Sequence, residues 1–207
     1  RERTYIRESK DSKLSTASIM DSINYMLCYN PQIRVCIEPK PNEPMDHSYI
    51  PTTGHAIALS QLCTDHKRVG VNIESAHAIL AGLDPSDEMG YALAFQKLWT
   101  VHLNDQNGLK FDQDKSFGSV DIRRAFNQVR ILDKYDYGKN GEWVGLDVKA
   151  MRTQKFEHST KHLENSRKVF LRLLEISRSL DENAINKLIN ERNYEELEML
   201  IIKKLIG

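Results

Sequence analysis

The stretch "RVGVNIESAH", residues 68–77, decides the fold. Its first half is apolar nearly throughout, which is typical of a strand that is covered on both faces within a parallel sheet. The apolar run stops at Glu74, and His77 follows three residues later, so both side chains can turn toward one ion as the chain leaves the strand. The stretch therefore predicts a buried parallel strand with a functional site at its carboxyl end.

Three other segments repeat this pattern of an apolar strand that ends in a polar side chain. Helical patterns separate the strands, and strand followed by helix, four times over, indicates βαβ units and a parallel sheet. Parallel α/β proteins place their chemistry at the carboxyl ends of such strands. The predicted strands are 33–38, 68–74, 98–104 and 143–147, and the polar residues that end them are Glu38, Glu74, Asn104 and Asp147.

Capping residues and apolar periodicity predict the helices. Ser12 and Ser119 are expected to cap two of them, and Asp84 followed by Pro85 begins another. A helix over 54–62, a long one over about 155–178 and two short ones over 182–190 and 194–205 complete the pattern. The residues expected to face inward are Ile19, Ile23, Met26 and Leu27, then Ile122, Phe126 and Val129, then Phe156, Leu163, Phe170 and Leu174.

The number of strand–helix units sets the fold class. A closed (β/α)8 TIM barrel usually needs about 250 residues, whereas this chain has 207 residues and four units. We therefore expect an α/β fold in which residues 1–178 form the C-terminal half of a TIM barrel. Residues 179–207 are expected to form a helical extension that lies on a neighbouring subunit, with packing on its own domain as the alternative. Open edges and an uncovered interior predict a fragment, or a half that pairs with a partner chain.

Composition narrows the class of protein. The chain carries 29 basic and 29 acidic side chains, a balance that weighs against a nucleic-acid partner. No apolar run approaches the roughly 20 residues that span a bilayer, and the start of the chain lacks the apolar core of a signal peptide. The three cysteines are scattered and form no CxxC motif. We expect a cytoplasmic protein that acts on small molecules.

Further acids join the strand ends. The motif "FDQD" offers Asp112 and Asp114, alternate residues that an extended loop points to one side. Carboxylates crowded at a buried rim repel one another and lose hydration, so cations are expected among them. Oxygen-rich ligands with one or two imidazoles suit magnesium, manganese or cobalt better than zinc.

Four motifs resemble, in order and spacing, the metal-binding segments of the xylose isomerase family. They are "IEPKPNEP", "NIESAHAILAGL", "HLNDQNGLKFDQDKSFGS" and "LDVKAMRT", within residues 33–180. The resemblance implies a (β/α)8 barrel that interconverts an aldose and a ketose by a hydride shift with two divalent ions. It implies Glu38, Glu74 and Asp147 as ligands of a structural ion, with Glu74 bridging to a catalytic ion that His77, Asp112 and Asp114 also bind.

The same resemblance assigns the remaining site residues. Lys40 is implied as the ammonium that contacts the oxygen on sugar carbon one, Asp114 as a further catalytic residue and Asn104 as a substrate contact. Pro39 and Pro41 fix the chain on either side of Lys40, so its ammonium needs no ordering at the moment of reaction. Glu43 is expected to support these residues from behind.

This chain departs from the family pattern at His102, where the family usually has an aspartate ligand of the structural ion. We interpret His102 as a substituted ligand. Five carboxylates and Lys40 then carry a net charge of −4, which two divalent ions neutralise. Because imidazole is a poor magnesium ligand, the substitution predicts a preference for manganese or cobalt. A second departure is the missing N-terminal half, which in the family supplies the ring-opening histidine. No histidine here takes that role, and His158 with His162 is expected to be a solvated pair.

Three other readings remain open. The chain could act on another aldose, because the residues that select the sugar lie mostly in the missing half. It could bind metal or assemble without catalysis. An apurinic-site endonuclease also holds metals with His, Asp and Glu, but the balanced charge and the "EPKP" motif weigh against it. A homo-oligomer is expected for the isomerase reading.

Overall fold

The computed structural model describes residues 11–43 and 47–207. Its centre is a parallel sheet in which the strands follow the chain order β1-β2-β3-β4. The strands are β1 (Val35–Ile37), β2 (Val69–Glu74), β3 (Leu98–Leu103) and β4 (Trp143–Leu146). All four predicted strands are confirmed with ends that move by one or two residues, and the parallel α/β arrangement is confirmed as well.

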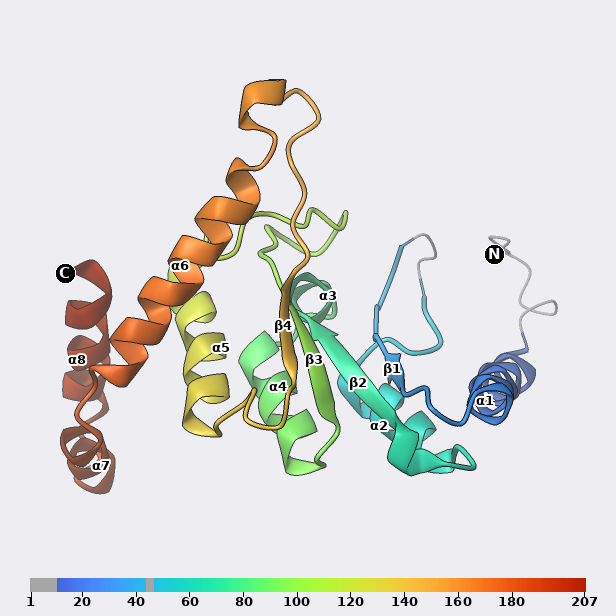
Figure 1. Cartoon of the computed structure of the whole chain (residues 1–207). Helices are drawn as coiled ribbons and strands as arrows, with labels where there is room; N and C mark the ends of the chain where they lie inside the picture. The colour runs from blue at the N-terminus through green and yellow to red at the C-terminus, as the bar shows by residue number, and fades with distance from the viewer. Residues whose placement is uncertain (1–10, 44–46) are drawn as a thin grey trace.

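Helices cover one face of this sheet (Figure 1). The helices among the described residues are α1 (Ser12–Tyr29), α2 (Thr53–Leu62), α3 (Ser75–Leu80), α4 (Pro85–Ala94), α5 (Ile122–Lys134), α6 (Lys161–Arg178), α7 (Glu182–Asn190) and α8 (Tyr194–Ile206), with short 3-10 turns η2 (His66–Arg68) and η3 (Phe156–His158). Among these, α4 and α5 pack on each other, and α5 packs on α6. The arrangement is half of the expected barrel with its helices outside.

Alternation along the strands separates an outer, helix-covered face from an inner face. Val71, Ile73 and Val101 point to the outer face and are buried in the main core. On the inner face, Cys36 and Trp143 remain exposed. Only β2 is buried along its whole length. The prediction that all four strands are covered on both faces is therefore wrong for the described residues.

Close packing on the inner face explains one glycine. The Trp99 ring lies directly over Gly70, and a Cβ at position 70 would come within 2.2 Å of it. The guanidinium of Arg34 lies over the Trp99 ring, with its central carbon 3.7 Å from the ring centroid. The Trp99 ring can thus lie across β2 because position 70 has no side chain.

Several helix boundaries differ from the predictions. Asp11 and not Ser12 caps α1, and Asp121 and not Ser119 caps α5, since the aspartate side chains accept from Leu14 N and Arg124 N. Asp84 caps α4 as predicted. The long helix begins only at Lys161, which leaves Phe156 on a separate turn, where it is 90% exposed. Of the other residues expected to face inward, Met26, Ile122 and Leu163 are exposed.

The predicted positions of the last two helices, α7 and α8, are confirmed to within one residue. Ile201 of α8 is buried, and Ile185 of α7 and Leu205 of α8 pack against the main core. Arg123 of α5 also forms an ion pair with Glu198 at 2.9 Å. In this chain the extension therefore packs on its own domain, which is the alternative that the sequence left open. None of the helices among the described residues has the length and apolar character needed to cross a membrane.

Candidate metal centre

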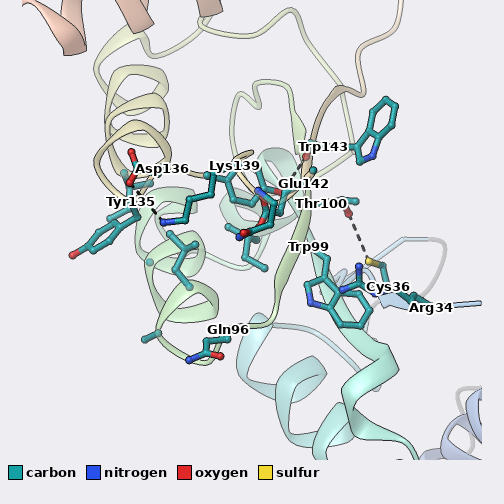
Figure 2. A pocket seen from close by; sticks show the side chains of 18 residues that line it. Arg34, Cys36, Gln96, Trp99, Thr100, Tyr135, Asp136, Lys139, Glu142 and Trp143 are labelled. Atoms are coloured by element: carbon teal, nitrogen blue, oxygen red, sulfur yellow. Dashed lines mark hydrogen bonds and ion pairs between the residues drawn. The ribbon is translucent and has the colours of Figure 1, made fainter.

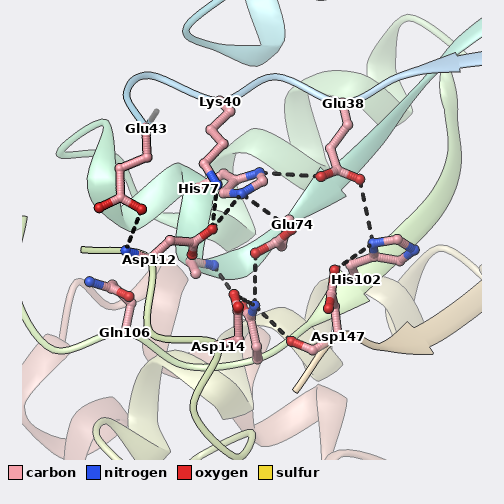
Figure 3. A network of polar contacts seen from close by, with 12 residues as sticks. Glu38, Lys40, Glu43, Glu74, His77, His102, Gln106, Asp112, Asp114 and Asp147 are labelled. Atoms are coloured by element: carbon pink, nitrogen blue, oxygen red, sulfur yellow. Dashed lines mark hydrogen bonds and ion pairs between the residues drawn. The ribbon is translucent and has the colours of Figure 1, made fainter. Parts of the chain in front are cut away.

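The strand register brings the predicted ligands to one end of the sheet (Figure 3). Glu74 pairs with His102 across β2 and β3, and His102 pairs with Gly145 across β3 and β4. Glu38 and Asp147 each follow directly after an edge strand. Because the strands are parallel and adjacent, the carboxyl ends meet at one rim, and the four ligand-bearing side chains point to the inner face.

Three groups of side chains have ligand atoms that all lie within 4.8 Å of one another, a spacing that suits a metal ion. Every group contains Glu74, the residue that the family resemblance implies as a bridge between two ions. The described structure thus brings all seven predicted metal ligands together. The groups are Glu38, Glu74 and His77; Glu74, His102 and Asp147; and Glu74, Asp112 and Asp114.

Glu74 is the most deeply buried of the acids, with a side chain only 3% exposed. Burial raises its pKa to about 9, and the negative charges of Asp112, Glu38 and Asp147 add to this shift. One hydrogen bond opposes it, from Asn104 Nδ2 to Glu74 Oε1 at 2.8 Å. A carboxylate in this setting is ionised at neutral pH only when a cation lies beside it.

His77 reports more directly that a ligand belongs here. Its Nε2 lies 3.2 Å from Asp112 Oδ2 and 3.3 Å from Glu74 Oε2. Its buried Nδ1 has no hydrogen-bond partner among the described residues, and neither has Asp112 Oδ1. Buried polar atoms without partners are rare in folded proteins. His77 Nδ1 lies 3.5 Å from Glu38 Oε1. An imidazole nitrogen and carboxylate oxygens at such spacings fit a divalent ion, and the oxygen-rich set fits magnesium, manganese or cobalt.

Two lysines neutralise the loop acids. Lys40 Nζ donates to Asp112 Oδ2, and Lys149 Nζ donates to Asp114 Oδ2 at 2.7 Å. Burial would raise the pKa of Asp112, but hydrogen bonds from His77 and Lys40 outweigh it and hold this pKa well below its usual range. Burial, together with the neighbouring Asp112, raises the pKa of Asp114. Burial acts against the charge of Lys40, yet Asp112 raises the pKa of this ammonium.

His102 lies where the substituted ligand was expected. Its Nδ1 is 3.4 Å from Glu38 Oε2 and 3.4 Å from Asp147 Oδ2. Asn72 Nδ2 lies 3.0 Å from the same nitrogen and also donates to Glu38. Space for the ring comes from Gly145, because a Cβ there would be 3.0 Å from His102 Cδ2. An imidazole at this position therefore depends on a glycine in the next strand.

Asn104, which the resemblance implies as a substrate contact, is held by protein groups in this structure. Its side chain is almost fully buried and donates to Glu74, Asp114 and the Asp147 carbonyl, while its Oδ1 accepts from Ala76 N at 2.7 Å. These bonds favour a positioning role over the predicted substrate contact. Glu43 supports the site as expected, since its Oε2 accepts from Asp112 N at 3.1 Å.

Sequence reasoning missed Asn72 and Lys149. Lys149 lies beyond the end of β4, where no strand alternation applies, but Asn72 stands two residues before the predicted ligand Glu74 within β2, and the alternation of a strand places such neighbours on the same face. That spacing was the available signal. His158 and His162 do not form one helical pair, because His158 lies on η3 and His162 on α6.

A cavity lies near the amino ends of the strands, opposite to the candidate metal centre (Figure 2). Its volume is about 930 Å³, and its lining includes Arg34, Cys36, Trp99, Thr100 and Trp143. These residues stand at the amino ends of β1, β3 and β4. Since the carboxylates converge at the carboxyl ends, this cavity and the candidate metal centre are separate features.

A parallel sheet with helices on its outer face and carboxylates and imidazoles gathered at its carboxyl rim is the arrangement of an α/β barrel protein with a candidate metal site at that rim. Comparison with known proteins agrees, since residues 5–165 match the family model described as "Xylose isomerase-like TIM barrel". The chain therefore belongs to the family of xylose isomerase-like TIM barrels.

One curated relative is a named enzyme of this family. A xylose isomerase from Streptomyces lividans is 38% identical over 125 residues, which cover 60% of this chain and 31% of that protein. The chain thus spans about a third of the length of the curated relative that it matches.

Proposed function

We propose that this chain carries the metal centre of a sugar isomerase that interconverts an aldose and a ketose by a 1,2-hydride shift. The observation that carries the proposal is the buried Glu74, which all three groups of potential ligands share, beside the fixed ammonium of Lys40. The likeness to a xylose isomerase supports the choice of reaction.

Each ligand has a place in the proposed centre. Glu38, Glu74, His102 and Asp147 hold a structural ion, while Glu74, His77, Asp112 and Asp114 hold a catalytic ion. When bound, the two divalent ions polarise sugar oxygens and stabilise the negative charge that develops on them. We propose manganese or cobalt as the preferred ions because of His102, with magnesium as the weaker choice.

Lys40 supplies the remaining positive charge. Its raised pKa keeps it protonated, so it can donate to the oxygen on sugar carbon one as negative charge grows there. The main chain around it is fixed, because Lys40 N donates to Ile50 O at 3.0 Å between Pro39 and Pro41. A group that is already oriented needs no reorganisation during the reaction.

The length of the matched region bounds the proposal. The chain corresponds to 31% of its relative, so the choice of sugar and the assembly into a homo-oligomer, or with the other half of a barrel, are proposals. A half-barrel that binds metal without catalysis is the alternative from another class. A related isomerase that acts on another sugar is the alternative within the same class.

Metal counting and a ketose assay test the proposal. Elemental analysis after dialysis against manganese is expected to give two ions per chain. Ketose formation is then measured with xylose, glucose and several deoxy and L-sugars, and Lys40→Met serves as the control that keeps both ions and loses turnover. A chain that binds no ion would refute the proposed centre. Two bound ions without ketose from any sugar would favour the non-catalytic half-barrel.

A further inference from the structure

The loop that carries Asp112 and Asp114, residues 107–114 and here called the ligand loop, lacks an apolar anchor of its own. Leu109 is 61% exposed and Phe111 is 73% exposed, so neither stabilises the loop by burial. Phe111 and Asp114 also have positive φ angles of 59° and 44°. Such conformations are unfavourable for non-glycine residues and persist only where surrounding contacts impose them.

Glu43 and Lys149 supply some of those contacts, since Glu43 Oε2 accepts from Asp112 N, and Lys149 N and Nζ donate to Asp114 O and Asp112 O. Several others come from one side chain, Gln106, which is only 1% exposed. Its Nε2 donates to Phe111 O at 2.9 Å and Gly108 O at 3.1 Å, with a longer contact to Lys110 O at 3.4 Å. Its Oε1 accepts from Gln113 N at 3.0 Å. One buried carboxamide therefore bonds to both arms of the ligand loop.

Two further bonds close the loop around this carboxamide. Gln113 Oε1 accepts from Asn107 N at 3.0 Å, which joins the first and seventh residues of the ligand loop. Asp105 fixes the base, since its backbone pairs with Lys115 in both directions and its Oδ2 accepts from Val120 N. Gln106 stands between these two ties, at the centre of the network.

We propose that Gln106 is a positioning residue that presets the ligand loop so that Asp112 and Asp114 face Glu74 and His77 before any ion binds. This inference rests on the proposed function, because it assigns Gln106 a role toward the catalytic ion of that centre. The structural ion takes its ligands from strand ends and from no residue of the ligand loop. Gln106 therefore acts on one ion and not on the other.

The chemistry of the carboxamide provides a sharp variant. Gln106→Glu keeps the shape and the acceptor oxygen but replaces the donor by a second acceptor against three carbonyl oxygens, which repel it. Gln106→Ala removes both functions. Gln128→Ala is the matched control, because Gln128 is also almost fully buried and hydrogen-bonded, but lies on α5.

Manganese titration followed by calorimetry and electron paramagnetic resonance tests the inference on this chain. We expect Gln106→Ala and Gln106→Glu to lower the affinity for one of the two manganese ions at least tenfold, while the affinity for the other ion changes less than twofold. Amide hydrogen exchange of residues 107–114 should accelerate at least tenfold in both variants without metal. Gln128→Ala should lower thermal stability and leave both ions in place.

The outcomes separate this inference from the proposed function. Two tight ions in both Gln106 variants, or unchanged exchange in the ligand loop, would overturn the positioning role and leave the metal centre standing. Normal binding in Gln106→Glu alone would show that side-chain shape suffices, which also contradicts the inference. A native chain that binds no manganese would overturn the proposed function itself, and with it the role assigned here.

Discussion

The two ends of the same four strands are built differently. At the carboxyl ends, charged side chains hold one another, and Glu74 and His77 are almost fully buried. At the amino ends, the strands border a cavity of about 930 Å³ with exposed side chains such as Trp143. The cavity at the amino ends has few fixed charged groups, whereas the candidate ligands are held together at the carboxyl ends.

Cavity size therefore does not point to the proposed metal centre of this chain. Catalysis requires groups whose orientation is set before the substrate arrives, and that condition is met at the carboxyl rim. There, Asn104 alone ties together Glu74, Asp114 and the backbone of Asp147. At the amino ends the corresponding tie is a stacked pair, Arg34 on Trp99, which orients no carboxylate.

The variant Glu74→Gln should break the comparison most completely. Removing the shared carboxylate takes one ligand from each of the three groups at the rim, so both ions should be lost while the cavity at the other end is unchanged. Elemental analysis after dialysis measures the loss, with Gln128→Ala as the control for a buried polar change. Two ions retained by Glu74→Gln would show that the carboxylate does not bridge them.

The pH dependence of the metal-free chain should sharpen the comparison. The pKa of Glu74 is raised from 4.5 to about 9 in the folded chain, so its contribution to stability is present below pH 4.5 and is lost as pH rises toward 9. Each pKa unit corresponds to about 1.4 kcal/mol, so the loss should reach several kcal/mol. Urea unfolding at pH 5, 7 and 9 measures it.

Two comparisons check this assignment. Saturating manganese should remove the fall in stability with rising pH, because the ions favour the ionised carboxylate. Glu74→Gln should remove it as well, since the amide does not titrate. If the metal-free native chain keeps the same free energy of unfolding from pH 5 to pH 9, Glu74 is not held protonated by its surroundings.

Much of this contrast could be predicted from sequence, because it depends on local pattern. Runs such as "VGVNIE" are apolar and β-branched, and their polar last residues fix which end of the sheet holds the acids. The caps were harder to predict. Asp11 stands beside Ser12 and Asp121 close to Ser119, and in both cases the carboxylate, which is favoured at a helix N-terminus, is the cap.

The connections within the site could not be predicted in the same way. Asp112 meets His77 only because an irregular loop returns across the end of the sheet, and no periodicity describes that path. The saturation of Asn104 by four protein groups likewise depends on Asp114 and Asp147 arriving from other segments. Sequence patterns therefore identified the candidate ligands, while the bonds among them required the folded chain.

Replacement of His102 by aspartate tests how the rim selects its ion. The imidazole favours manganese or cobalt over magnesium, and His102→Asp should shift the ratio of affinities toward magnesium about tenfold to a hundredfold. Competition titrations with both ions measure the ratio. In the native chain, nitrogen coupling in the manganese resonance should include His102 and should decrease in the variant.

Gly145 provides the matched test for this position. A Cβ there would come within 3.0 Å of the His102 ring. Gly145→Ala should therefore lower the manganese affinity of the native chain and have less effect when His102→Asp is also present. An equal preference for the two ions before and after His102→Asp would mean that the ring does not bind the ion.

The smallest effect is expected at the amino ends of the strands. Trp143 is 75% exposed. The hydrogen bond that Tyr137 Oη donates to it, at 3.0 Å, goes to the backbone oxygen of Trp143 and not to its ring. Trp143→Ala should therefore change the free energy of unfolding by no more than about 0.5 kcal/mol and leave both manganese affinities within twofold. Urea unfolding and calorimetry of the same preparation measure the two quantities. A loss of either ion would mean that the amino ends of the strands influence the rim, and the separation between the two ends of the sheet would no longer hold.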